Sequence, residues 1–120
     1  MLKVGTDLVS IARIEHSVGR FGERFLQRYL NPAEGNLSTP SASLAGFWAA
    51  KEAVAKALGC GIGAELGFHD ILLEKDAKGA PFFRLSERAF KRFPLRDSSL
   101  SISHDGGFAI AVAIIVLRER

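Results

Sequence analysis

Apolar and polar residues alternate over the first eight positions of the chain. Every second residue there is apolar or β-branched, in the order Leu2, Val4, Thr6 and Leu8. This period of two predicts a β-strand. Asp7 falls inside that strand on the same face as Gly5, and aspartate is unfavourable in strands. Asp7 therefore marks either a turn at the strand end or a carboxylate held for a purpose.

The apolar spacing becomes helical after Ser10, which can cap a helix. Apolar residues then follow a helical repeat up to Phe25, while Gly19 and Gly22 predict a bend or break. An adjacent flank carries a stripe of arginines: Arg13, Arg20, Arg24 and Arg28. Residues 31–34, with sequence NPAE, have the cap, proline and glutamate typical of a helix start, so they predict a second, short helix. Residues 35–43 form a polar connector.

The stretch 43–59 is rich in alanine, contains no proline and ends on Gly59, which predicts the main helix. Its apolar positions cover most of its circumference, as in a buried helix. Charges on such a helix need a partner or a function. Glu52 and Lys56 lie one turn apart on a face of small residues. Lys51 lies within the apolar face and either snorkels to water or reaches an anionic ligand.

The remaining sequence predicts two strand pairs and one more helix. A glycine-rich loop, 60–67, precedes a hairpin of 70–75 with 81–85, and Ser86 caps a short helix through Phe93. Strands 98–103 and 108–116 flank the turn at 104–107. This order predicts one α+β domain over residues 1–120, with an antiparallel sheet packed against a long central helix.

Composition narrows the class of protein. The 120 residues are 48% hydrophobic, enough for a core, and 16 Lys+Arg against 13 Asp+Glu leave a net charge of +3. That moderate excess suits an acidic or phosphate-bearing partner rather than nucleic acid. The single Cys60 is predicted to pack as a small residue in a reducing compartment. The apolar run 108–117 is too short to span a membrane, so we expect a soluble, cytoplasmic protein.

Two carboxylates stand out as candidate metal ligands, Asp7 and Glu52. Neither has a cysteine or histidine at zinc-like spacing, and oxygen ligands favour Mg²⁺, which commonly combines one or two carboxylates with water and substrate phosphates. Lys56 would complete a phosphate site. The opposing interpretation is an ordinary exposed ion pair between Glu52 and Lys56, worth about 0.2–0.5 kcal/mol.

These motifs together resemble the holo-acyl-carrier-protein synthases, the small 4′-phosphopantetheinyl transferases. The resemblance covers nearly the whole chain. The matching segments are 4–7 (VGTD), 13–14 (RI), 30–34 (LNPAE), 49–53 (AAKEA), 56–59 (KALG), 61–62 (GI), 79–81 (GAP) and 101–104 (SISH).

The resemblance implies transfer of phosphopantetheine from coenzyme A to a serine of apo-acyl carrier protein, with adenosine 3′,5′-bisphosphate released. It implies that Asp7 and Glu52 hold Mg²⁺ and act in catalysis with Lys56. Further contacts to coenzyme A would come from Lys51, Lys56, Gly59, Gly61, Ser103 and His104. Glu52, Asp7 or a water on the metal are each open as the general base.

The resemblance also implies a homotrimer whose active sites lie between subunits, so that the glycine loop and His104 act from across an interface. Arg13, Arg20 and Arg24 would dock the acidic carrier protein.

One position departs from the family, which commonly has arginine where this chain has Phe47, so a contact to a phosphate of coenzyme A is in question.

The rival hypothesis is a non-catalytic basic module that binds RNA or protein. It lacks support, because the chain has no aromatic ribonucleoprotein motif and no zinc knuckle.

Overall fold

The alternating N-terminal segment forms the edge of a three-stranded sheet. The computed structural model describes residues 1–119, in which β1 (Leu2–Ser10), β5 (Phe108–Leu117) and β4 (Leu95–Asp105) pair antiparallel in the order β1-β5-β4. The turn between β4 and β5 consists of Gly106 and Gly107, both at positive φ. The predicted turn is confirmed, although β4 runs beyond the predicted 98–103 at both ends.

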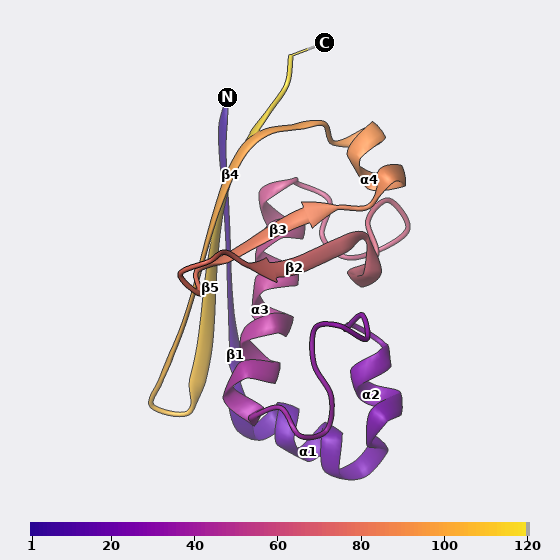
Figure 1. Ribbon diagram of the computed structural model, residues 1–120, viewed down its shortest axis with the longest axis vertical. Helices are drawn as coiled ribbons and strands as arrows, with labels where there is room; N and C mark the ends of the chain where they lie inside the picture. The colour runs from indigo at the N-terminus through magenta and orange to yellow at the C-terminus, as the bar shows by residue number, and fades with distance from the viewer. Residues whose placement is uncertain (120) are drawn as a thin grey trace.

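The predicted main helix is α3 (Ser41–Ala57), which starts two residues before the predicted 43 and lies along one face of the sheet (Figure 1). Two glycines allow this close packing. A Cβ on Gly46 would lie 2.8 Å from a methyl carbon of Ile102 in β4, and one on Gly5 in β1 would lie 2.0 Å from the carbonyl oxygen of Ala53. The helix therefore crosses the sheet from β4 at its N-terminal half to β1 at its C-terminal half.

The predicted first helix breaks at Gly22, which has a φ of 58°, into α1 (Ile11–Phe21) and α2 (Glu23–Gln27). Ser10 caps α1 as predicted, accepting a hydrogen bond from the Arg13 backbone N–H at 3.4 Å. The predicted helix start at 31–34 is wrong, because these residues form turns only. Glu34 does accept from the Asn31 backbone N–H at 2.8 Å, but no helix follows.

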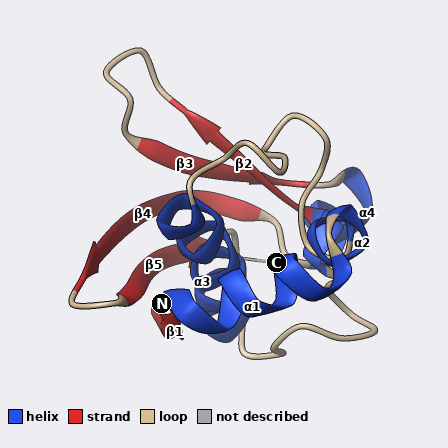
Figure 2. Ribbon diagram, turned by 90° about the horizontal axis from the view of Figure 1, so that it is seen from below, coloured by secondary structure: helices blue, strands red, loops and turns tan. Residues whose placement is uncertain are grey.

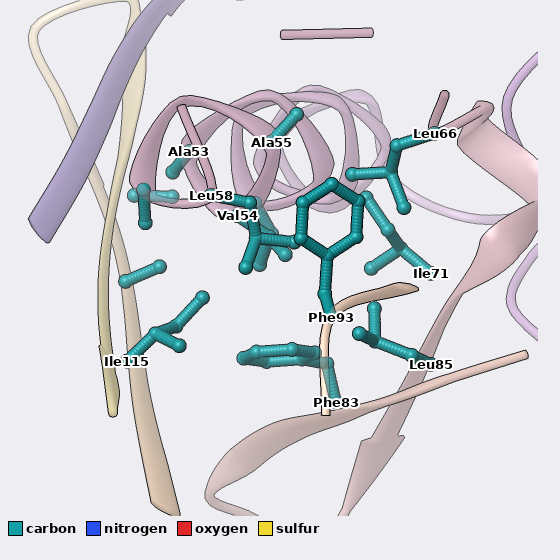
Figure 3. Packing of buried hydrophobic residues seen from close by; sticks show 14 of the residues in the cluster. Ala53, Val54, Ala55, Leu58, Leu66, Ile71, Phe83, Leu85, Phe93 and Ile115 are labelled. Carbon is teal, nitrogen blue, oxygen red and sulfur yellow. The ribbon is translucent and has the colours of Figure 1, made fainter. Parts of the chain in front are cut away.

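A second, smaller antiparallel pair, β2 (Ile71–Lys75) and β3 (Pro81–Leu85), lies beside β4 and α3 and confirms the predicted hairpin (Figure 2). It is preceded by the short 3₁₀ helix η1 (Phe68–Asp70) and followed by α4 (Glu87–Arg92), which Ser86 caps. Val54 and Leu58 of α3 pack toward Phe83 and Phe93 in the core between these layers (Figure 3). Among residues 1–119 no helix is long and apolar enough to cross a membrane.

The contact at Gly5 gives a first prediction. Gly5→Ala places a methyl group inside the backbone of α3, and overpacking of this kind costs about 3 kcal/mol or more. We expect a loss of that size in the free energy of unfolding, measured by urea denaturation.

Gly19→Ala is the matched control. Gly19 lies in α1 and a Cβ there meets nothing within 4 Å, so the substitution should be neutral or stabilise by about 0.5–1 kcal/mol. Equal stability of the two variants would show that β1 and α3 are not held in this close contact.

Candidate active site

The edge strand β1 and the central helix α3 bring two carboxylates and one lysine together. Because Gly5 lets β1 touch α3 near Ala53, Asp7 on the same strand face comes beside Glu52 and Lys56. The Lys56 ammonium lies 2.9 Å from Oδ1 of Asp7 and donates to the backbone oxygen of Thr6 at 3.1 Å. Asp7 therefore lies beside the helix face that carries Glu52 and Lys56, as the proposed metal site requires.

The charges at this cluster are unevenly satisfied. Partial burial raises the pKa of Glu52, the negative charge of Asp7 raises it further, and Lys56 opposes both. The hydrogen bond to Asp7 is the largest cause of the raised pKa of Lys56. Burial and the neighbouring carboxylate of Asp7 therefore both disfavour the ionised form of Glu52.

These residues fit a magnesium ion. The oxygen donors of Asp7 and Glu52 repel each other, and a cation between them would relieve that repulsion. The part of the chain that the structure describes holds no cluster of three or more His, Cys, Asp or Glu residues. A metal here would take its other ligands from water or substrate, which is the usual coordination of Mg²⁺.

Lys51 takes no part in this cluster, although it directly precedes Glu52. It is fully buried, and its ammonium lies 2.7 Å from Oε1 of Glu34. Burial lowers its pKa, and Glu34 opposes that shift. The second oxygen of Glu34 accepts from the backbone N–H of Leu73 at 2.8 Å. Lys51 thus ties α3 to the loop before it and to β2. This geometry does not support the predicted contact between Lys51 and coenzyme A.

Gly59 and Gly61 have positive φ angles of 84° and 65°. Their backbone N–H groups donate to the carbonyls of Lys56 and Ala55, which ends α3. These N–H groups are therefore already used within the protein. The space beside each of these glycines is open. A ligand such as coenzyme A therefore has room to approach the backbone there closely.

The loop after these glycines is held by α4 and η1. Arg88 donates to the carbonyl of Ala64 at 3.2 Å and to Asp70 at 3.0 Å, and Asp70 also accepts from the backbone N–H of Gly67. The loop therefore has a fixed position beside the C-terminal end of α3.

Ser103 and His104 lie on β4, across the sheet from Asp7. Asp7 pairs with Ala111 of the central strand, and Ala111 pairs on its other side with Ile102. Two strand spacings, about 10 Å, therefore separate the β1 and β4 edges. His104 instead lines a cavity of about 610 Å³ together with residues of α3 and the β2–β3 hairpin.

Phe47 lines that same cavity, as does Lys75. The arginine expected at position 47 from the family resemblance is therefore absent from this cavity. Lys51 is buried against Glu34, whereas Lys75 is exposed at the cavity. The residue pattern gave no signal for this cavity, since its walls come from three separate segments.

The three arginines predicted to dock a partner are all exposed. Arg13 and Arg20 lie on α1 and Arg24 on α2, and the described residues provide none of them with an acidic partner. Arg20 lies over the ring of Phe21.

The chain as a whole is similar to one group of transferases. The family model of the 4′-phosphopantetheinyl transferase superfamily matches residues 3–113. A holo-[acyl-carrier-protein] synthase of Sulfurovum sp. is 57% identical over 95% of this chain and 96% of its own length.

Solved structures agree with this match. The Helicobacter pylori holo-[acyl-carrier-protein] synthase, in complex with coenzyme A, has a TM-score of 0.90 and 51% identity over 94% of this chain and 99% of its own. The enzyme of Neisseria meningitidis has a TM-score of 0.85 and 33% identity over 95% of this chain and 97% of its own. The chain belongs to the 4′-phosphopantetheinyl transferase superfamily, as one of its holo-[acyl-carrier-protein] synthases. The rival hypothesis of a non-catalytic RNA- or protein-binding module is therefore wrong.

The two lysines of α3 give a second prediction. Lys51→Met leaves the buried Glu34 carboxylate without its cation, and breaking a buried pair in this way costs about 3–5 kcal/mol. Lys56→Met removes a half-exposed pair with Asp7 and should cost less than about 1 kcal/mol. Urea denaturation of both variants measures the difference. Similar losses would mean that the environments of the two lysines are not as distinct as the structure shows.

Proposed function

We propose that this chain, as a single domain over residues 1–120, transfers the 4′-phosphopantetheine group of coenzyme A to a serine of apo-acyl carrier protein in a Mg²⁺-dependent reaction. The serine oxygen forms a bond to the phosphorus that carries pantetheine, and the bond from that phosphorus to the nucleotide breaks. Adenosine 3′,5′-bisphosphate leaves, and the serine proton passes to a base. The observation that carries this proposal is the Asp7, Glu52 and Lys56 cluster in a chain of this family.

Each member of the cluster has a distinct part in this reaction. Asp7 and Glu52 would hold the Mg²⁺, which when bound offsets negative charge on the pyrophosphate. The Lys56 ammonium is exposed and already oriented by Asp7 and the Thr6 carbonyl, so it can pair with a phosphate oxygen. Glu52 has no hydrogen-bond donor among the described residues. Glu52, Asp7 and a water on the metal are the candidate acceptors of the serine proton.

The test is mass spectrometry of an apo-acyl carrier protein incubated with coenzyme A and Mg²⁺. We expect a gain in mass equal to phosphopantetheine with the wild type, and none without Mg²⁺ or with Asp7→Asn or Glu52→Gln, because each substitution removes a charged ligand. Circular dichroism and thermal denaturation check that the variants are folded. Normal transfer by a folded Glu52→Gln variant at limiting Mg²⁺ would contradict the metal assignment.

We further propose a homotrimer with active sites shared between neighbours. The outer face of the main sheet supports association, because it exposes apolar side chains that the chain itself leaves uncovered: Leu2, Val4, Leu8, Ile110 and Ile114. In a closed head-to-tail ring, the β1 edge of one subunit would meet the β4 edge of the next. That arrangement would bring Ser103 and His104 to the Asp7 cluster of a neighbour. The number three comes from the family resemblance.

Mixed subunits test the sharing of sites. Asp7→Asn inactivates the β1 edge and leaves the β4 edge intact, and His104→Ala does the reverse. Each variant alone should be nearly inactive, whereas co-refolded subunits should regain activity at about a quarter of their sites, since random mixing pairs two intact edges at that frequency. Native mass spectrometry verifies that mixed rings have formed. Mixed rings without any recovered activity would rule out shared sites.

Arg13, Arg20 and Arg24 are proposed to dock the carrier protein through its acidic residues. Such exposed charges steer encounter and are screened by salt. Arg13→Glu or Arg20→Glu should raise the apparent KM for carrier protein several-fold at low salt, with little change in the KM for coenzyme A. The defect should shrink as salt increases. Equal changes in both KM values would place these arginines at the catalytic centre instead.

A cytoplasmic location stays a prediction.

A further inference from the structure

The 610 Å³ cavity on the β4 side of the molecule has largely apolar walls. It lies between the N-terminal half of α3, the β2–β3 hairpin and β4. Its larger apolar lining residues include three with flat rings, Pro40, Phe47 and Pro81, together with Leu73 and Ile102. A cavity of this size and character suits a flat ring with a polar edge. Thr39, Ser43 and His104 supply the polar groups.

The charged residues of the cavity are mostly neutralised within the protein. The Glu34 carboxylate forms an ion pair with Lys51 at 2.7 Å, and Glu74 forms an ion pair with Arg84. Lys75 is then the one lysine or arginine among the described residues that line the cavity. It is exposed, so a single pair with an anion there changes affinity by a factor of about five or less.

Coenzyme A offers this cavity two groups, an adenine ring and a phosphate on the 3′-oxygen of the ribose. The pyrophosphate and pantetheine belong at the Asp7 cluster, where the bond breaks. In the proposed ring, the nucleotide end would extend from the Asp7 cluster of one subunit into the cavity of the next. The apolar walls, Phe47 included, favour the ring, while the lone Lys75 provides little for the 3′-phosphate.

We infer that the 3′-phosphate contributes little to substrate recognition, and that this enzyme also transfers phosphopantetheine from 3′-dephospho-coenzyme A. The inference rests on the proposed function. The reaction is the same substitution at phosphorus. A bond forms to the serine oxygen, the bond to the nucleotide breaks, and the leaving group is adenosine 5′-monophosphate instead of adenosine 3′,5′-bisphosphate. Phe47 and Lys75 are the residues that determine this specificity.

The experiment compares kcat/KM for the two donors, with the mass gain of an apo-acyl carrier protein as readout. For the wild type we expect a preference for coenzyme A of about fivefold or less. Phe47→Arg adds a planar cation at the cavity and should raise the preference to about tenfold or more, since guanidinium binds phosphate in a bidentate manner. Lys75→Met should bring the preference close to one.

Phe47→Leu is the matched control, because it keeps the cavity apolar and changes no charge. It should lower kcat/KM for both donors by the same factor and leave the preference unchanged. A wild-type preference of a hundredfold or more would overturn the inference while leaving the proposed function intact. A preference unaltered by both Phe47→Arg and Lys75→Met would also overturn it. Absence of transfer from either donor would instead contradict the proposed function.

Discussion

The contact between β1 and α3 at Gly5 is the constraint on which the candidate active site depends. A side chain at Gly5 would occupy the position of the Ala53 carbonyl, since a Cβ would lie 2.0 Å from that oxygen. Only a glycine therefore lets the strand lie directly on the helix. Asp7 shares the strand face of Gly5, so the same contact delivers its carboxylate to Glu52 and Lys56. A larger separation would leave Asp7 apart from Glu52 and Lys56.

The two lysines of α3 lie in different environments. Lys51 is fully buried and its partner Glu34 accepts hydrogen bonds from three segments of the chain, so this pair is satisfied within the protein. Lys56 is half exposed, and Glu52 beside it is held with a raised pKa. Because ionised Glu52 is disfavoured in the folded state, it reduces stability at neutral pH. Such unrelieved charge is common where a ligand binds.

Local sequence patterns predicted the helices and strands. They did not predict which residues far apart in the sequence contact each other. The alternation around Val4 and the capping of Ser10 are set by neighbouring residues, and both predictions were confirmed. The turn at 31–34 was mistaken for a helix because the capping contact of Glu34 forms without a helix behind it. The partner of Lys51 lies 17 residues away, outside any helical repeat. The sequence showed only that this lysine needed a partner.

The positions of the charged cluster and of the cavity in the sheet give a reason why this small chain would form an oligomer. Its charged cluster lies at the β1 edge, and the cavity with Phe47 and His104 opens on the β4 side, with the central strand β5 between them. Coenzyme A joins a pyrophosphate to an adenosine, so the proposed function would use both features in one site. One copy presents them at opposite edges of its sheet. In the proposed ring the two edges would lie side by side, and the apolar outer face of the sheet would give the copies a surface to bury.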